Sequence, residues 1–145
     1  MKISKETLEE LIDCYDDSQM DHEYFLNIET NEVAFLSSFM VRNEYDEVME
    51  EVEEGFGEIY FRVPQTDSHE GFTDMEEFVE TVASDKIKSE LYDALSRNRG
   101  VFRRFKDVLA ENPDIQQQYY QYKYDINKTR IIDWLRSEEI LIDES

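Results

Sequence analysis

The stretch that most constrains the fold is EYFLNIETNEVAFL, residues 23–36, in which two runs of aromatic and β-branched residues flank a polar turn. Runs of this kind favour β-strands, and a short polar turn between them predicts an antiparallel hairpin. Asn31 in the turn tolerates the left-handed backbone that such a turn needs. Residues 58–64, EIYFRVP, predict a third strand that Pro64 ends. Since sequential strands usually pair, we expect a small antiparallel sheet of about three strands.

Two helices are predicted among these strands. Residues 3–15 and 43–55 repeat apolar residues at the i, i+3, i+4 and i+7 spacing of one buried helix face. Ser4 can cap the first helix, while Asn43 can cap the second and Gly55 can end it. The residues predicted to face the core are Leu8, Leu11, Ile12, Tyr15, Tyr45, Val48, Met49 and Val52.

The second half of the chain is predicted to be helical. Thr73 and Ser84 stand at N-cap positions before two apolar stripes, and Gly100 precedes a third. Asn112 before Pro113 marks the start of a long last helix, after which EILID closes the chain as an extended tail. These elements predict an α+β fold, in which about five or six helices pack on the small antiparallel sheet.

The length of 145 residues predicts a single domain over residues 1–145, since this is the size of one ordinary domain. Within it we expect a sheet-containing acidic half over about residues 1–66 and a helical half over about residues 67–145. Four glycines and two prolines leave no room for long flexible linkers.

Charge restricts the partners of this chain. It carries 36 Asp and Glu against 15 Lys and Arg, a formal net charge of -21, and residues 1–72 hold 20 of the acids and 4 of the bases. Such a surface repels nucleic acids and anionic membranes, so we expect no membrane binding and no non-specific nucleic-acid binding. A single cysteine, no signal peptide and no apolar run of membrane-spanning length favour a reducing cytoplasm.

Basic residues gather against this trend in SRNRGVFRRFK, residues 96–106, where a helix is predicted to begin. The amides of a helix's first turn lack intrahelical partners, and arginine forks match phosphate or carboxylate oxygens in pairs. The cluster is therefore a candidate ligand-binding site for a phosphate, a nucleotide or an acidic peptide. The alternative is charge balance with the many acids, for example in an i, i+4 pair of Arg103 with Asp107. The five residues of the basic cluster are Arg97, Arg99, Arg103, Arg104 and Lys106.

No catalytic residue, metal site or cofactor is predicted. His22 and His69 each have acids beside them, but neither has a second ligand at a metal-binding spacing. Cys14 has acidic neighbours that disfavour its thiolate, so we expect a buried, inert thiol. The chain has no glycine-rich phosphate loop, no Gly-x-Ser-x-Gly elbow and no Cys-x-x-Cys pair.

Two other patterns have both a functional and a structural interpretation. Residues 45–54 carry six acids beside an apolar stripe, which is either an imitation of nucleic-acid phosphates or an ordinary solvated helix face. QQQYYQYKYD, residues 116–125, places four tyrosines beside Lys123, which either stack on bases or pack in the core at helical spacing. We favour the structural interpretation of both.

The hairpin YFLNIETNEV, the stretch RVPQTDSHEGFTDMEEFV, the core GVFRRFKDVL and the late DWLRSEEI together resemble the bacterial uncharacterised protein family 0158. The resemblance covers about residues 24–142, and this chain has Asn31 where the family's hairpin turn often has glycine. It implies a small cytoplasmic bacterial protein, and it brings no catalytic residue that can be transferred to this chain.

Together these features predict a non-enzymatic cytoplasmic interaction or regulatory protein. Its acidic half would face a protein partner with a basic surface, and the basic cluster would take an acidic or phosphate-bearing group. One alternative is a nucleotide- or phosphate-handling protein or enzyme, with its site between the basic cluster and residues 67–70. Another is an acidic, phosphate-mimicking inhibitor of a nucleic-acid-binding protein.

Overall fold

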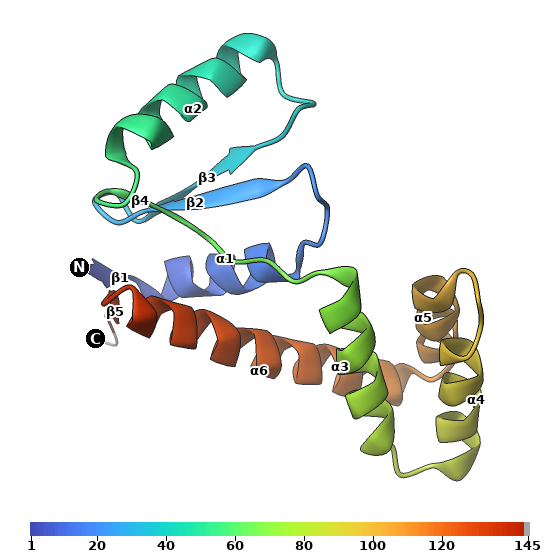
Figure 1. Ribbon diagram of the computed structural model, residues 1–145. Coiled ribbons are helices and arrows are strands. Elements are labelled where there is room, and N and C mark those ends of the chain that lie inside the picture. Colours follow the sequence, from blue (N-terminus) through green and yellow to red (C-terminus); the bar gives the residue numbers. More distant parts are fainter. Residues whose placement is uncertain (144–145) are drawn as a thin grey trace. The chain divides into compact units, whose positions relative to one another are not determined.

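A computed structural model of the chain describes residues 1–143 (Figure 1). The elements form two compact units: one holds residues 1–66 and the C-terminal segment from Asn127, and the other holds residues 67–126. The described residues contain six helices, a three-stranded antiparallel sheet and a small parallel strand pair. The predicted α+β class is therefore confirmed.

The antiparallel sheet belongs to the first unit and has the strand order β3-β2-β4. β2 (Glu23–Asn27) and β3 (Glu32–Leu36) form the predicted hairpin, and β4 (Tyr60–Arg62), shorter than predicted, pairs with the other edge of β2. Asn31 adopts the expected left-handed conformation, with φ 62°. Its side-chain oxygen accepts a hydrogen bond from the Ser4 amide at 2.9 Å, so the hairpin turn is tied to the start of the first helix.

The first helix, α1 (Lys5–Asp16), begins at the predicted cap. The Ser4 hydroxyl accepts a hydrogen bond from the Thr7 amide at 3.1 Å, which satisfies one of the N–H groups that have no partner within the helix. The predicted core face of this helix is buried: Leu8, Leu11, Ile12 and Tyr15.

The second helix, α2 (Arg42–Gly55), ends at Gly55 as predicted but begins two residues earlier than a cap at Asn43 implies. Its N-cap is Val41, no side chain caps it, and the predicted cap Asn43 lies inside the helix. The prediction was wrong because valine has no polar atom to mark the boundary, whereas the nearby asparagine has one. The buried side of α2 packs with Phe25 of β2, in agreement with its predicted apolar stripe.

The last helix, α6 (Pro113–Ser137), starts at the predicted proline and contributes to both units. The segment after it is not a free tail: β5 (Leu141–Ile142) pairs in parallel with β1 (Lys2–Ile3). Ile3 and Ile140 are nearly inaccessible, which anchors this small pair in the first unit. Strands of two residues are too short to show a periodicity, so the sequence did not predict the pairing.

The second unit consists of α3 (Ser68–Glu80), α4 (Asp85–Leu95), α5 (Val101–Glu111) and the first part of α6. α4 begins after its predicted cap Ser84, whose hydroxyl accepts a hydrogen bond from the backbone amide three residues on.

The start of α3 differs from its prediction. The N-cap is Asp67, whose carboxylate accepts a hydrogen bond from the Glu70 amide at 2.8 Å, and the predicted cap Thr73 lies inside the helix. The Thr73 hydroxyl donates to the carbonyl of His69 instead. Aspartate is at least as good an N-cap as threonine, so the helix can begin six residues before the predicted cap.

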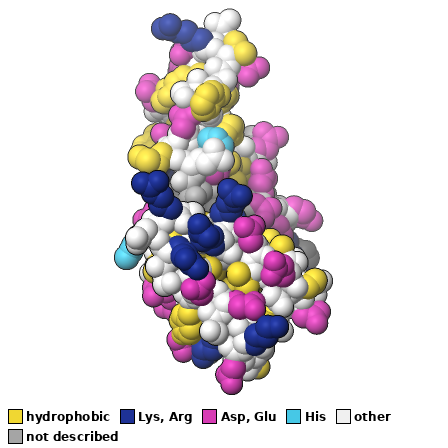
Figure 2. Space-filling view, turned by 90° about the vertical axis from the view of Figure 1, so that its right-hand side faces the viewer, with side chains coloured by type: hydrophobic (Ala, Val, Ile, Leu, Met, Phe, Trp, Pro, Cys, Tyr) yellow, Lys and Arg dark blue, Asp and Glu magenta, His cyan; other side chains and the backbone are white. Residues whose placement is uncertain are grey.

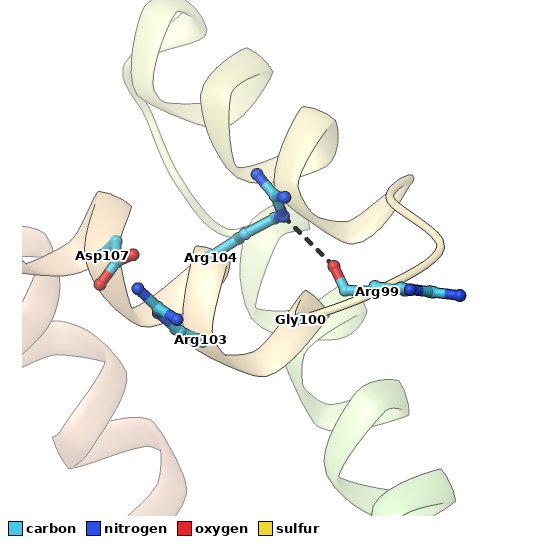
Figure 3. A pocket seen from close by; sticks show the side chains of 5 residues that line it. All are labelled: Arg99, Gly100, Arg103, Arg104 and Asp107. Atoms are coloured by element: carbon cyan, nitrogen blue, oxygen red, sulfur yellow. Dashed lines mark hydrogen bonds between the residues drawn. The ribbon is translucent and has the colours of Figure 1, made fainter.

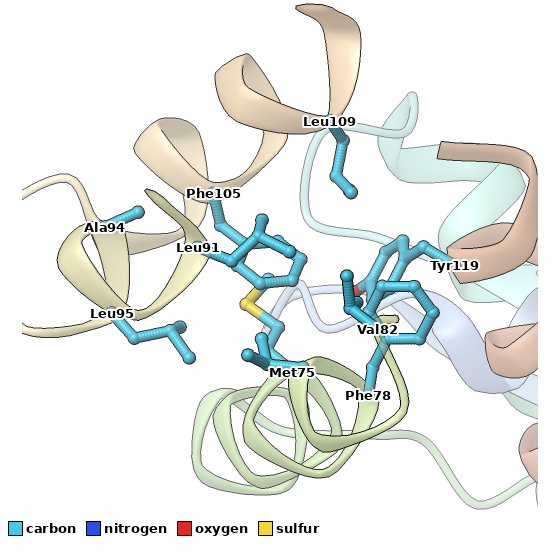
Figure 4. Packing of buried hydrophobic residues seen from close by; sticks show 10 residues of the cluster. Met75, Phe78, Val82, Leu91, Ala94, Leu95, Phe105, Leu109 and Tyr119 are labelled. Carbon is cyan, nitrogen blue, oxygen red and sulfur yellow. The ribbon is translucent and has the colours of Figure 1, made fainter. Parts of the chain in front are cut away.

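These helices enclose a core of their own, which Figure 4 shows. The ring of Tyr119 packs edge-on against Phe78 and Phe105, with centroid distances of 5.2 and 5.3 Å. Phe105 and Leu109 of α5 are fully buried, so this helix is held by one apolar face and exposes the other. For Tyr119, which is 4% exposed, the core-packing interpretation of the tyrosine run is therefore confirmed.

One ion pair of the second unit is buried. The Lys123 ammonium of α6 lies 3.0 Å from the Asp74 carboxylate of α3, and the two side chains are 12% and 1% exposed. Buried charges of this kind need a partner, because removal from water disfavours the ionised form of each group.

Candidate anion-binding site

The connection from α4 to α5 positions the basic cluster. α4 ends at Leu95, and the chain reaches α5 through residues 96–100. Gly100, the N-cap of α5, has φ 65° and ψ 30°, a left-handed conformation in which a side chain would be strained. The glycine therefore lets the chain turn directly into α5, so that Arg103 and Arg104 fall in its first turns.

All five residues of the basic cluster are exposed, and Figure 2 shows Lys and Arg side chains gathered on one face of the molecule. Arg97 is balanced within its own segment, because its guanidinium lies 2.9 Å from the carboxylate of Asp93, one helical turn earlier. This part of the cluster follows the charge-balance interpretation.

Three of the five residues line an open pocket of about 260 Å³ at the start of α5 (Figure 3). Arg104 donates from Nε to the Arg99 carbonyl at 3.2 Å, which holds its guanidinium over the connection. The Arg103 side chain extends toward Asp107, and the Arg99 side chain extends in the opposite direction (Figure 3). We call this hollow the arginine pocket; its lining residues are Arg99, Gly100, Arg103, Arg104 and Asp107.

The positive charges of Arg99 and Arg103 in the arginine pocket are not neutralised by ion pairs within the described chain. The expected ion pair of Arg103 with Asp107 does not form within 4.0 Å, and the side chains of Arg99 and Arg103 make no ion pair with any residue of the described chain. The prediction of that pair was therefore wrong, although the two residues have the correct helical spacing. The lining of the pocket thus contains three arginines and one carboxylate.

The N-terminus of α5 adds to the positive potential. Gly100 offers no side-chain cap and the first turn contains no acid, whereas α1, α3 and α4 are capped by Ser4, Asp67 and Ser84. The N–H groups of an uncapped first turn and the helix dipole favour a nearby anion, by about 0.3–1 kcal/mol in exposed positions. An anion beside Arg103 would therefore interact with both backbone and side-chain donors.

His69, which the enzyme interpretation places next to the basic cluster, does not line the arginine pocket. It is exposed in the first turn of α3. Among the lining residues, Asp107 is the one that carries a carboxylate.

His22 takes part in a hydrogen-bond network of the first unit. Its Nδ1 lies 2.6 Å from the Asp17 carboxylate, and the Tyr24 hydroxyl donates to the same oxygen at 2.7 Å. Burial raises the pKa of Asp17, but hydrogen bonds from Tyr24, the Gln19 amide and His22 outweigh it and hold this pKa below its usual value. Within residues 1–143, no group of three or more His, Cys, Asp and Glu residues is arranged to hold a metal ion.

Cys14 lies buried on α1, as predicted. Burial, together with the negative charges of Glu10, Asp13 and Asp17, raises the pKa of its thiol to about 12. At neutral pH the side chain is therefore a protonated thiol, which is a poor nucleophile.

The acidic run of residues 45–54 and the tyrosine run of residues 116–125 are both partly exposed to solvent. The six acids of residues 45–54 are all exposed on α2, and Tyr120 of α6 is 55% exposed while Tyr122 packs against the core of its unit. Sequence reasoning missed one feature, the exposed apolar residues Met20, Phe39 and Val41. The signal that could have found them is their position in segments between predicted elements, where polar residues are usual.

The chain matches the model of an uncharacterised protein family, UPF0158, over residues 5–143, and it therefore belongs to that family. No curated protein and no solved structure matches it. None of the helices formed by residues 1–143 has the length and apolar character needed to cross a membrane.

Proposed function

We propose that this member of family UPF0158 is a cytoplasmic interaction protein without catalytic activity, and that it binds a phosphate or carboxylate group in the arginine pocket. The observation that carries the proposal is the state of Arg99 and Arg103, which form no ion pair within residues 1–143 although the chain has 36 acids. Its acidic half, in this proposal, faces a protein partner with a basic surface.

Arg42, Lys88, Arg97 and Lys123 each lie within 4.0 Å of a carboxylate, whereas exposed cations such as Lys5 and Lys86 form no ion pair within residues 1–143. Arg99 and Arg103 differ from these scattered cations because they line one pocket together with Arg104. Adjacent cations at the positive end of a helix, by contrast, repel one another and the helix dipole while no anion is bound. A bound anion would offset this repulsion, which would explain why arginines occupy these positions.

The size of the arginine pocket favours one anionic group of a larger partner over a whole enclosed ligand. Its volume is about 260 Å³, whereas pockets that enclose drug-sized ligands typically measure about 300–1,000 Å³. The terminal nitrogens of Arg104 and the full guanidinium of Arg103 remain as donors, in the planar fork that matches two oxygens of a phosphate or carboxylate.

A nucleotide- or phosphate-handling protein is the second candidate, because the same arginines would hold a nucleotide's phosphates at the pocket mouth. Its chemistry would have to use Asp107 as the acid or base, since His69 lies outside the lining. The third candidate, a phosphate-mimicking inhibitor, draws support only from the exposed acids of α2.

Thermal melting against a ligand panel tests the proposal. The panel contains inorganic phosphate, pyrophosphate, ATP, a phosphoserine peptide, a glutamate-rich peptide and a short oligonucleotide. A ligand that binds the folded state raises the melting temperature, by the equivalent of about 2.7 kcal/mol at a concentration of about 100 times Kd. We expect a shift with phosphate-bearing or acidic peptides and its loss in Arg103→Glu/Arg104→Glu.

The matched control is Arg42→Glu/Lys86→Glu, which changes the net charge equally at exposed positions outside the pocket lining. It should keep the shift. If the pocket variant binds as well as the wild type, or if no anionic ligand shifts the melting temperature, the arginine pocket is not a binding site. A shift with ATP that exceeds those of both peptides would favour the second candidate.

A further inference from the structure

The segment between β3 and α2, residues 37–41, presents an aromatic side chain to solvent on a well-held turn. Ser37 is 4% exposed and Met40 packs against the core cluster of the first unit, so the chain is anchored inward on both sides of Phe39. The Phe39 amide donates to the Ser37 hydroxyl at 3.2 Å, and the Met40 amide donates to the Ser37 carbonyl at 3.1 Å. Phe39 is nevertheless 90% exposed. The hydrogen-bonded conformation of this turn therefore keeps the Phe39 ring exposed to solvent.

A second turn, which contains Met20 and Asp21, is joined to this one by hydrogen bonds. Asp21 precedes β2, and its carboxylate accepts hydrogen bonds from the Ser37 hydroxyl at 2.9 Å and from the amide and hydroxyl of Ser38 at 3.0 and 2.8 Å. Both segments lie at the same end of the hairpin (Figure 1). The residue before Asp21 is Met20, whose side chain is fully exposed.

These turns expose three apolar side chains, which we call together the Phe39 surface: Met20, Phe39 and Val41, which are 100%, 90% and 66% exposed. Phenylalanine and methionine are enriched in protein interfaces and rare on free surfaces, and methionine adapts its shape to different partners. Since hydrogen bonds hold the backbone of both turns, little ordering would be needed when a partner binds.

The charge around the Phe39 surface indicates the kind of partner. α2 begins directly after Val41 and carries seven acids and one arginine, and residues 1–72 hold 20 acids against 4 bases. A second copy of this chain would bring the same charge and be repelled, as would an anionic membrane or a nucleic acid. A cationic protein segment with a large apolar side chain would match both the negative charge of α2 and the apolar side chains of the Phe39 surface.

We propose that the Phe39 surface binds a basic amphipathic segment of another protein, whose apolar side chain packs on Phe39 while its lysines and arginines face the acids of α2. This inference rests on that part of the proposed function which gives the acidic half a basic partner. It does not depend on the arginine pocket, so the two claims can fail separately.

A random library of 12-residue peptides displayed on phage provides the test. The library is selected against the full wild-type chain, and enriched peptides are synthesised and their Kd measured by fluorescence anisotropy. The test variant is Phe39→Ser/Met20→Ser, which keeps the net charge and alters only exposed side chains. The control Phe56→Ser/Tyr120→Ser removes two other exposed aromatic residues, which are 61% and 55% exposed.

We expect enriched peptides that combine Lys or Arg with Leu, Phe, Trp or Met. Their affinity should fall at least about tenfold in the test variant and stay unchanged in the control, because truncation of a central anchor typically has an effect of this size. It should also weaken with added salt, since the Debye length shortens from about 10 Å at 0.1 M to about 3 Å at 1 M.

The inference is overturned if no peptide is enriched, if enriched peptides lack basic residues, or if they bind the test variant as tightly as the wild type. The variant Arg103→Glu/Arg104→Glu separates the two claims. It should bind these peptides with unchanged or higher affinity, while it loses the anion-induced melting shift.

Discussion

Replacing Lys123 by methionine should destabilise the protein far more than replacing Arg97, although each residue forms an ion pair with an aspartate. The Lys123–Asp74 distance is 3.0 Å, with side chains 12% and 1% exposed. The Arg97–Asp93 distance is 2.9 Å, but these side chains are 52% and 65% exposed. The distances are nearly the same, so burial is the main difference between the pairs.

The magnitudes follow from this difference. Two unit charges 3.0 Å apart attract each other by about 5.5 kcal/mol at an effective dielectric constant of about 20, and by about 1.4 kcal/mol in water. Breaking a buried pair typically costs about 3–5 kcal/mol, because the remaining charge stays buried, whereas an exposed pair contributes about 0–1 kcal/mol. We expect Lys123→Met to lower the free energy of unfolding by about 3–5 kcal/mol and Arg97→Met to lower it by less than about 1 kcal/mol.

Urea unfolding followed by circular dichroism, carried through two double-mutant cycles, measures both pairs. Asp74→Asn with Lys123→Met should give a coupling energy of about 2–3 kcal/mol, and Asp93→Asn with Arg97→Met should give about 0.5 kcal/mol or less. In about 1 M NaCl the second value should vanish while the first persists. Equal coupling energies for the two pairs would refute the reasoning that burial decides their strength.

Three further predictions concern the backbone, the thiol and the acid range. Gly100→Ala should lower the free energy of unfolding by about 1 kcal/mol because of its φ of 65°, whereas Gly71→Ala, inside a helix and with ordinary contacts to a new Cβ, should be neutral or stabilising; thermal melting compares them. Cys14 should react with a disulfide reagent near pH 8 at least about 100-fold more slowly in the folded than in the unfolded protein. The reason is that its thiol is buried, with a pKa of about 12, and equal reaction rates would contradict this. The lowered pKa of Asp17 contributes stability that is complete above its usual value of 3.8 and is lost as the pH falls through the lowered pKa; Tyr24→Phe should therefore make the acid-range loss of stability shallower in urea titrations at several pH values.

The fold could largely be predicted from apolar spacing, because burial of one helix face or strand face leaves a periodic pattern. The residues that fill the core of the second unit, Phe105 and Leu109 among them, follow from this pattern alone. Helix starts were less predictable, since capping depends on a single residue: Asp67 rather than Thr73 caps α3, and Val41 caps α2 without any polar atom.

Long-range polar pairing could not be predicted at all. The Asp21 carboxylate bonds Ser37 and Ser38, more than a dozen residues away, and no local pattern indicates which acid accepts from which hydroxyl. In the basic cluster even local pairing could not be predicted, although the composition of the cluster was visible in the sequence. Arg97 is neutralised and Arg103 is not, although both have an aspartate at the same helical spacing.

A backbone and arginine side-chain NMR titration with pyrophosphate tests most directly whether the arginine pocket binds anions. If it does, the largest shifts should saturate together at the first-turn amides of α5, Val101 and Phe102, and at the Nε–H groups of Arg103 and Arg104. Shifts that grow without saturation and spread equally to exposed cations such as Arg42 and Lys86 would show non-specific ion binding, and would contradict the proposed site.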